Sequence, residues 1–301
     1  MKIALIITHW NNSNDLIKCL KSIQKASAVP GLIYIVDNNS HISHLKNLNL
    51  FLKNYSHIKL IQNKQNFGVP KSWNIGIKNA LQQKIDFVWI LNADTTVSKE
   101  ALSSLIKTYK SLKAPIIGSH MFFESKKDLI QDKASISFSK WKGYGKNKKF
   151  LDKLTQPYEC YYISGCSMFL HANCFKNIGL FNEDLFFLGD EIDYCLRAKK
   201  LNIKIFCDPS SVIYHEGSAS VPKKTPLRKY YETRNALYNV KNFFSNYIII
   251  SIFYHFFRIL ILDLIFRNQG TKQFQASFEG LLDFLKNKKG KWSKQDLLII
   301  N

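Results

Sequence analysis

The sequence predicts an α/β fold with a mostly parallel, doubly wound central sheet. Through the N-terminal third of the chain, short apolar runs alternate with amphipathic segments and are joined by short connections. Such alternation is typical of strands linked by crossover helices. The run Phe87–Leu91 is apolar throughout, as expected for a strand that is buried on both faces of a parallel sheet.

The predicted elements follow one another in a regular order. Strands are expected at Ile3–Ile7, Leu32–Val36, Ile58–Ile61 and Phe87–Leu91, with helices at Asp15–Gln24, within Ser43–Lys53 and at Ser72–Leu81. Later segments are a mobile basic loop at Lys140–Lys153, a strand in Tyr161–Leu170, a loop and helix in Phe181–Leu201, and short strands at Ile203–Phe206 and Val212–Tyr214. After Pro226 the pattern is helical, so we predict a main domain over residues 1–225 and a helical extension over residues 226–301.

The composition narrows the class of protein. The 301 residues include 43 Lys and Arg against 22 Asp and Glu, and this charge of +21 favours polyanionic partners such as nucleic acid, anionic lipid or a phosphorylated substrate. A hydrophobic content of 46% excludes a disordered chain. The six cysteines lack Cys-x-x-Cys or zinc-like spacing, which indicates small buried side chains in a reducing compartment. The N-terminus shows no signal-peptide cleavage site, so we expect a cytoplasmic location.

Asp94 directly follows the strand Phe87–Leu91, where a parallel sheet opens into a ligand crevice. A carboxylate there suits Mg²⁺ or Mn²⁺ carrying a diphosphate, because these ions take one or two protein oxygens and fill their shell with phosphate and water. The alternative is that Asp94 only caps the helix that begins near Ser98. His215 ends the strand Val212–Tyr214, and a neutral imidazole there can complete a metal shell begun by Asp94.

Polar residues also follow the first two strands. Asp37 stands at the end of Leu32–Val36, where an Asp commonly accepts hydrogen bonds from a ribose or base, although an Asx-turn alone also accounts for it. Thr8, His9 and Trp10 follow the first strand, where they either line a nucleotide pocket or simply pack.

The segment Asn66–Asn74 leads from the third strand into a helix. Gly68 permits an unusual backbone angle, Lys71 offers a cation, and the helix N-terminus offers free N–H groups to phosphate. Asn74 lies within the same segment, which is not a Walker loop. The pattern indicates a phosphate-binding segment of a different kind.

The strongest cluster of carboxylates comprises Asp190, Glu191 and Asp193. Three carboxylates behind two phenylalanines are costly to bring together unless one is protonated, metal-bound or paired. Arg197 can pair with Asp193 at i+4, which leaves Asp190 and Glu191 at a helix N-terminus. One of them can act as a general base toward a hydroxyl, and a solvated acidic helix turn is the alternative.

The order of these motifs resembles that of the inverting, nucleotide-sugar-dependent glycosyltransferases of family 2, which have the GT-A fold and include bacterial rhamnosyl- and galactofuranosyltransferases. The likeness in motif order runs from Lys2 to Ser220, and Tyr230–Asn235 is similar to the rhamnosyltransferase branch. The family's Asp-x-Asp motif is here Asn92-Ala93-Asp94, and its Glu-Asp pair is reversed as Asp190-Glu191.

The resemblance implies a role for each motif. Asp37 would hold the nucleoside, and Asn66–Asn74, Asn92 and Ala93 would line the nucleotide sugar. Asp94, with His215 and the amide oxygen of Asn92, would hold Mn²⁺ or Mg²⁺. Glu191 would take the proton of the acceptor hydroxyl, with Asp190 in contention, and inversion at the anomeric carbon would follow.

The resemblance also implies the partners. The donor would be a dTDP- or UDP-linked sugar, such as rhamnose, galactofuranose, a hexose or an N-acetylhexosamine. The acceptor would be a hydroxyl of a saccharide, lipid-linked in cell-surface polysaccharide synthesis.

The tail combines apolar and basic character. Tyr247–Phe266 is apolar, but Ser251, His255 and Arg258 fall on one helical stripe, which fits a helix lying in a membrane interface better than one crossing the membrane. The pattern repeats at Phe274, Phe278, Leu281, Leu282 and Leu285, followed by Lys286, Lys288, Lys289 and Lys291. We therefore expect peripheral contact with the inner face of the cell membrane. Packing on the main domain or in a homodimer is the alternative.

Two other functions account for part of the sequence. A sugar-phosphate nucleotidyltransferase would share the sheet and a metal-binding Asp, but its expected glycine-rich loop is missing from Thr8–Asn12. A basic nucleic-acid-binding protein would explain the charge but leaves Asp94 and the Asp190–Asp193 cluster unexplained, and no nucleic-acid-binding signature is evident. We therefore expect no nucleic-acid partner.

Overall fold

The computed structural model describes residues 1–127, 129–132, 134–146, 154–215, 225–261 and 271–295. The strands are β1 (Ile3–His9), β2 (Leu32–Asp37), β3 (Ile58–Gln62), β4 (Phe87–Asn92), β5 (Thr95–Val97), β6 (Ile116–Phe123), β7 (Ile130–Asp132), β8 (Ser137–Ser139), β9 (Tyr144–Lys146), β10 (Tyr158–Glu159), β11 (Ser167–His171) and β12 (Ile205–His215). The α-helices are α1 (Ser13–Gln24), α2 (Ile42–Leu52), α3 (Val69–Gln82), α4 (Ala101–Leu112), α5 (Asn173–Asn177), α6 (Asp190–Lys200), α7 (Pro226–Phe243), α8 (Ile248–Arg258) and α9 (Thr271–Leu285).

In the described part of the chain, ten strands form one sheet in the order β10-β12-β6-β11-β4-β1-β2-β3, with β5 beside β12 and β7 beside β6. The pairs β1–β2, β1–β4, β2–β3 and β6–β12 are parallel, whereas β11 runs antiparallel between β4 and β6. The predicted doubly wound α/β fold with a central parallel sheet is confirmed. The register sets His9 opposite Asp37 and Thr8 opposite Asn92, so the polar ends of β1, β2 and β4 meet at one edge.

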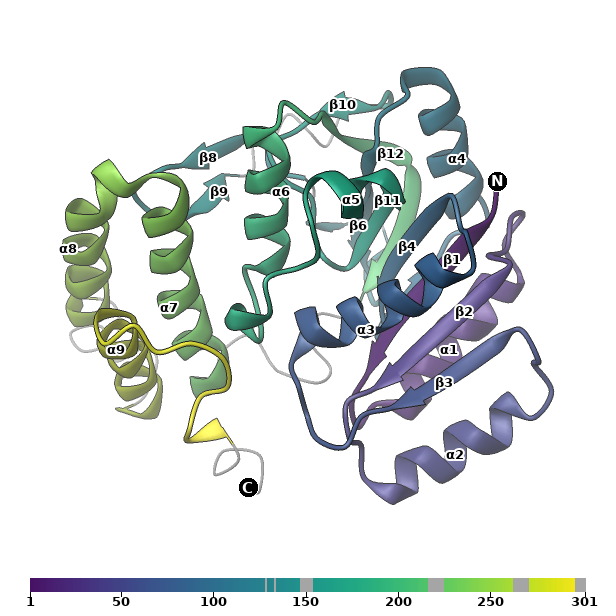
Figure 1. The fold of residues 1–301 in the computed structure, drawn as a ribbon, viewed down its shortest axis with the longest axis horizontal. Coiled ribbons are helices and arrows are strands. Elements are labelled where there is room, and N and C mark those ends of the chain that lie inside the picture. Colours follow the sequence, from purple (N-terminus) through teal and green to yellow (C-terminus); the bar gives the residue numbers. More distant parts are fainter. Residues whose placement is uncertain (128, 133, 147–153, 216–224, 262–270, 296–301) are drawn as a thin grey trace.

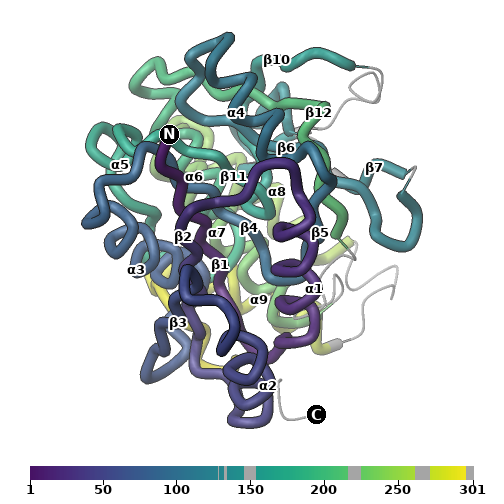
Figure 2. The backbone as a smooth tube through the Cα atoms, turned by 90° about the vertical axis from the view of Figure 1, so that its right-hand side faces the viewer, coloured from purple at the N-terminus to yellow at the C-terminus, as the bar shows by residue number. Residues whose placement is uncertain are grey.

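Helices cover both faces of the sheet. In β1, Leu5 and Ile7 pack into a core with α1, α2 and α4, whereas Ala4 and Ile6 pack into a second core with α3, α5 and α6. This division follows from the alternation of side chains along a strand. Figure 2 shows α3 and α5 on one side of the central strands and α1 on the other. Five of the six cysteines are buried, Cys166 is half-buried, and all six are free thiols, as the sequence predicts.

Three predictions of the sequence need correction. The expected strands Ile203–Phe206 and Val212–Tyr214 form the single strand β12, whose register shifts between Asp208 and Val212 because Pro209 cannot donate to the ladder. The strand expected in Tyr161–Leu170 is the shorter β11. The expected loop Lys140–Lys153 contains β9, which pairs with β8, and its residues 147–153 lie outside the described residues.

The C-terminal helices stand together beyond α6, at one end of the molecule (Figure 1). The apolar side of α9 faces α7, where Leu281 and Phe284 join a core with Leu237 and Tyr238. The membrane-facing pattern expected for this helix is therefore wrong at Leu281, which is only 3% exposed. Its burial favours the alternative of a helix packed on the rest of the chain.

In helix α8 the polar side faces the protein and the apolar side faces outward. Its polar residues Ser251 and His255 are completely buried, whereas Ile249 is 67% exposed, Phe253 58% and Phe257 53%. The polar stripe predicted from the sequence is thus present, but it faces the protein and leaves the apolar side outward. Within the described residues, no helix combines the length and the apolar character that a bilayer crossing requires.

Candidate active site

A cavity of about 430 Å³ opens at the edge of the sheet where β1 and β4 end. Its lining includes most of the residues that the sequence indicates for the nucleotide sugar, the metal and the general base. Those residues are Thr8, Trp10, Asn66, Gly68, Asn92, Ala93, Asp94, Asp190, Glu191 and His215. The two carboxylate motifs, which are far apart in the sequence, therefore face one space.

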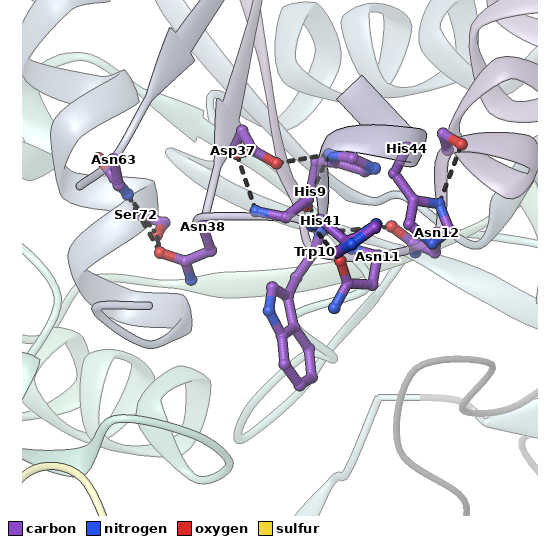
Figure 3. Close-up of polar contacts among 12 residues, drawn as sticks. His9, Trp10, Asn11, Asn12, Asp37, Asn38, His41, His44, Asn63 and Ser72 are labelled. Carbon is purple, nitrogen blue, oxygen red and sulfur yellow. Dashed lines mark hydrogen bonds and ion pairs between the residues drawn. The ribbon is translucent and has the colours of Figure 1, made fainter. Parts of the chain in front are cut away.

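Asp37 and His9 form a buried pair beneath this cavity. His9 donates through Nδ1 to Asp37 Oδ1 at 2.8 Å, and the backbone N–H of Ser40 donates to Asp37 Oδ2 (Figure 3). Burial alone would raise the pKa of Asp37, but the hydrogen bonds from His9 and Ser40 outweigh it and leave the pKa below its ordinary value. Both oxygens thus have protein partners in this geometry, and direct contact of Asp37 with a nucleoside stays a prediction.

Trp10 lies on the open side of the same strand end. Its indole points away from the Asp37–His9 pair, and the residue lines the cavity (Figure 3). A broad aromatic face at this position is suited to stack on a nucleobase.

Asn38, which the sequence analysis did not single out, makes four side-chain hydrogen bonds at the site. Its Oδ1 accepts hydrogen bonds from Ser72 Oγ and Asn63 Nδ2 (Figure 3). The same oxygen accepts from the backbone N–H of Phe67, and Asn38 Nδ2 donates to the Gly68 carbonyl. The end of β2 is thereby joined to the segment that begins α3. Gly68 has a φ of 82°, and a Cβ there would lie 2.4 Å from the Phe186 carbonyl oxygen, so only glycine fits.

Two residues of the predicted phosphate-binding segment point elsewhere. Lys71 lies with its amine 3.9 Å from Glu183 and over the ring of Phe67, outside the cavity lining. Asn74 is buried, where it donates to the Phe181 carbonyl and to Glu183 and accepts from the Phe181 N–H. In this geometry Asn74 ties α3 to the segment before α6.

Asp94 and His215 contact each other at the wall of the cavity. His215 Nε2 lies 3.2 Å from Asp94 Oδ2, and His215 Nδ1 lies 2.9 Å from Gln131 Oε1. An imidazole held on one nitrogen by an amide, with its other nitrogen beside a carboxylate, is a typical arrangement of metal ligands. No group of three or more His, Cys, Asp or Glu side chains in metal-binding distance occurs among the described residues. The pair fits a cation that takes its remaining ligands from phosphate and water.

Asn92 occupies the first position of the Asn92-Ala93-Asp94 motif. Its side-chain nitrogen donates to Cys166 Sγ at 3.1 Å, which fixes the orientation of the amide. Its role as a metal ligand stays a prediction.

Asp190 and Glu191 begin α6 and differ in environment. Asp190 is 2% exposed and Glu191 is half-buried at the junction of two cavities. Burial, and then the charge of Glu191, raises the pKa of Asp190 well above its ordinary value. A raised pKa favours the neutral form of Asp190, and of the two residues only Glu191 lines both cavities, so the geometry favours Glu191 as the base.

The predicted pairing of Asp193 with Arg197 is present. Arg197 Nε donates to Asp193 Oδ2 at 2.8 Å, and its Nη1 donates to the Ile178 carbonyl. Neither residue lines a cavity that reaches the carboxylate pair. The ion pair holds α6 against the preceding loop.

Helix α7 clamps the loop that presents Asp190 and Glu191. Asn235 Nδ2 donates to the carbonyls of Leu185, Phe187 and Leu188, and the fully buried Arg234 donates to the carbonyls of Leu185 and Gly290. Both loop residues with a left-handed backbone, Phe186 and Leu188, have a φ of 64°. The clamp therefore stabilises a strained turn directly before Asp190 and Glu191.

Sequence reasoning missed several residues that line the cavity. These include Tyr231 on α7 and Gln295, whose Oε1 accepts from the Tyr231 hydroxyl at 2.9 Å. Tyr231 belongs to the segment Tyr230–Asn235, which carried the likeness to rhamnosyltransferases and was the one available signal. The helical extension thus closes the site on one side.

Comparison with known proteins gives one family. The model of glycosyl transferase family 2 matches residues 4–176. The chain is 22% identical over 241 residues to the dTDP-rhamnosyl transferase RfbF of Shigella flexneri, covering 77% of each chain. It is 22% identical over 245 residues to the low-salt glycan biosynthesis hexosyltransferase Agl10 of Haloferax volcanii, covering 81% of this chain and 76% of that one.

Solved structures show the same fold. The crystal structure of S. aureus TarS 1-349 in complex with UDP has a TM-score of 0.56 at 15% identity, covering 96% of this chain and 92% of that one. The crystal structure of GalNAc-T7 with UDP, GalNAc and Mn²⁺ has a TM-score of 0.65 at 15% identity, covering 80% of this chain and 48% of that one. At this identity the likeness concerns the fold alone, which is that of GT-A glycosyltransferases.

Proposed function

We propose that this chain, which belongs to glycosyl transferase family 2, transfers a rhamnosyl or hexosyl group with inversion from a nucleoside-diphosphate sugar to a saccharide hydroxyl. The observation that carries the proposal is that the Asp94–His215 pair and the Asp190–Glu191 pair line one cavity at the end of a parallel sheet. A leaving diphosphate needs positive charge, which a cation held by Asp94 and His215 would supply, and an attacking hydroxyl needs a base, which the second pair would supply.

The donor would lie along the cavity edge formed by β1, β2 and α3. Trp10 offers a stacking surface for the base, and Asn38 holds the loop before α3, whose Gly68 lines the same cavity. The likeness to a dTDP-rhamnosyl transferase supports a dTDP donor, and the likeness to a UDP-bound structure supports a UDP donor.

Asp94 and His215 would hold Mn²⁺ or Mg²⁺, with the amide of Asn92 beside them. Such a cation offsets the negative charge of the departing diphosphate. Gln131 would orient His215 through its hydrogen bond to Nδ1. Asp94 Oδ2 and His215 Nε2 would thereby stay at the cavity wall as metal ligands.

Glu191 would take the acceptor proton. Its carboxylate stands at the wall that two cavities share, and the raised pKa of Asp190 favours the neutral form of the neighbouring carboxyl. The hydroxyl oxygen then bonds to the anomeric carbon while the bond from that carbon to the diphosphate oxygen breaks.

A membrane is the proposed setting, since a lipid-linked acceptor would be found there. The exposed apolar side of α8 and the charge of +21 support peripheral contact with an anionic inner leaflet. The membership in a transferase family favours this function over a nucleotidyltransferase or a nucleic-acid-binding protein.

Thermal unfolding in the presence of nucleotides tests the donor assignment. We expect UDP or dTDP, but not AMP, to raise the melting temperature, and the shift to be larger with Mn²⁺ than with EDTA. A protein that responds to none of these nucleotides would contradict the proposed function.

A further inference from the structure

A second cavity, of about 360 Å³, adjoins the first at the general base. The two cavities share Leu188, Glu191, Arg228 and Tyr231. The remaining lining comes from the loop around Gly143 and Tyr144 and from α6, α7 and α8: Gly189, Ile192, Glu232, Asn235, Ala236, Asn239, His255 and Arg258. Residues at the ends of β1, β4 and β12 line the first cavity, but none of them lines the second. A ligand in the second cavity would therefore approach Glu191 from a different direction.

Two buried side chains in this lining have unused hydrogen-bond acceptors. Asn239 donates through Nδ2 to the Gly189 carbonyl, and within the described residues its Oδ1 has no partner. His255 donates through Nε2 to the Lys142 carbonyl, and its Nδ1 likewise has no partner there. Burial and the nearby Arg258 lower the pKa of His255 to about 4, so its Nδ1 carries a lone pair at neutral pH.

The chemistry of these atoms selects the ligand. Asn239 is 1% exposed and His255 is completely buried, so leaving either acceptor unsatisfied is costly. Two unsatisfied acceptors on residues that line one cavity call for a ligand that brings several O–H donors. A saccharide has this property, and the half-buried ring of Tyr144 offers a surface on which a sugar can pack.

The charge in the cavity indicates an anionic group on the same ligand. Arg228 donates to Glu232 at 2.8 Å, so these two charges offset each other. Arg258 makes no ion pair with the described residues, although it lies in the cavity lining and is only half-exposed. An unpaired guanidinium in a partly enclosed site is a typical phosphate-binding group.

Helix α8 joins this cation to an apolar surface. Arg258 and His255 line the cavity, whereas Ile249, Ile250 and Phe253 of the same helix are more than half exposed. The molecule's strong positive charge complements an anionic bilayer against which this side would rest. A ligand with sugar, phosphate and hydrocarbon in that order would meet a matching surface at each part.

We propose that the second cavity is the acceptor site and that it takes a lipid-linked saccharide, with the sugar at Asn239 and His255, the phosphate at Arg258 and the hydrocarbon along the outer side of α8. The inference rests on the proposed function, because Glu191 must deprotonate the acceptor. The acceptor O–H proton passes to Glu191, its oxygen bonds to the donor's anomeric carbon, and the nucleoside diphosphate leaves with the electron pair of the broken bond.

Binding of farnesyl diphosphate, measured by calorimetry, tests this assignment. We expect Arg258→Gln to weaken its binding at least about tenfold, and Arg258→Lys to recover part of the loss. The control Lys272→Gln removes the same charge from the exposed start of α9 and should bind as the wild type does. Inorganic pyrophosphate should bind the wild type more weakly than farnesyl diphosphate, because it lacks the hydrocarbon.

Two further measurements separate the possible outcomes. UDP and dTDP binding should be unchanged in Arg258→Gln, and so should pelleting with phosphatidylglycerol vesicles. The assignment would be overturned if Arg258→Gln bound farnesyl diphosphate as the wild type does, or if the wild type bound pyrophosphate equally well. It would also be overturned if Arg258→Gln lost only vesicle pelleting, because Arg258 would then bind lipid headgroups. A joint loss of nucleotide and farnesyl diphosphate binding would also overturn it. A wild type that binds neither UDP nor dTDP would instead refute the proposed function.

Discussion

The side-chain amide of Asn235 donates to the backbone carbonyl of Leu188 at 2.7 Å, two residues before Asp190. The same amide nitrogen lies within hydrogen-bonding distance of the Leu185 and Phe187 carbonyls. One side chain of α7 thus fixes the turn that sets the start of α6. The helical extension therefore helps to place Asp190 and Glu191, and it is also a candidate membrane contact.

Asn235→Ala should lower kcat more than it changes the KM for the donor. Removing the amide leaves buried carbonyls unpaired beside two strained residues, which we expect to cost about 1–3 kcal/mol of folding free energy and to displace Glu191. Steady-state kinetics and urea unfolding measure both effects. The control Asn242→Ala changes an exposed asparagine of the same helix and should be neutral. An unchanged kcat in Asn235→Ala would show that the clamp does not position the base.

Asp190→Asn should alter the pH dependence of stability in a defined direction. The folded-state pKa of Asp190 is raised, so the wild type loses stability as pH rises above the carboxyl's unfolded value near about 4, until the folded pKa is reached. The asparagine variant has no such group. The unfolding free energy of the variant minus that of the wild type should therefore increase with pH, by up to about 1.4 kcal/mol per unit. A constant difference between pH 4 and pH 7 would mean that Asp190 is ionised in the folded protein.

Asp94→Ala should weaken binding of UDP or dTDP in the presence of Mn²⁺. The variant loses the carboxylate that faces His215, so a bound cation would have one charged protein ligand fewer. Calorimetry with Mn²⁺ and with EDTA measures the effect, and Asp15→Ala, on the surface of α1, serves as control. Equal affinity of the wild type with and without the ion, together with full activity in EDTA, would refute the metal assignment.

Phe253→Ser combined with Ile249→Ser should release the protein from anionic vesicles. Both side chains are more than half exposed, so their removal costs apolar burial in lipid without opening the core. Co-sedimentation with phosphatidylglycerol vesicles at low and high salt measures the change, and Leu50→Ser, an exposed leucine on α2, is the matched control. If the double variant sediments like the wild type while its tendency to dimerise falls, the outer side of α8 is a protein interface.

The sequence was sufficient to predict the strands that position the donor side of the site. Strands β1, β2 and β4 each carry an uninterrupted apolar run, and polar residues follow at the edge where the cavity opens. Strand β6 was missed because Gly118, Ser119 and His120 interrupt its pattern. Ser119 is buried there because Ser167 and Ser211, on the neighbouring strands, supply its hydrogen bonds. Such compensation from distant residues is invisible in a local pattern.

The surroundings of Glu191 were harder to predict for the same reason. Arg234 looks like a surface residue in the sequence, yet it is completely buried, because carbonyl groups at Leu185 and Gly290 satisfy its guanidinium. The polar stripe of α8 was correctly identified, but the direction that it faces depends on the Lys142 carbonyl, which accepts from His255. Long-range contacts of this kind decided which residues surround Glu191.

The turnover of Glu191→Gln tests the central claim most directly. The variant keeps the size and polarity of the side chain but cannot accept a proton. Release of nucleoside diphosphate, measured with the UDP- or dTDP-sugar and acceptor that give the highest wild-type rate, should fall by on the order of a hundredfold or more, while calorimetry shows unchanged donor binding. An active Glu191→Gln alongside an inactive Asp190→Asn would contradict the account and move the catalytic base by one residue.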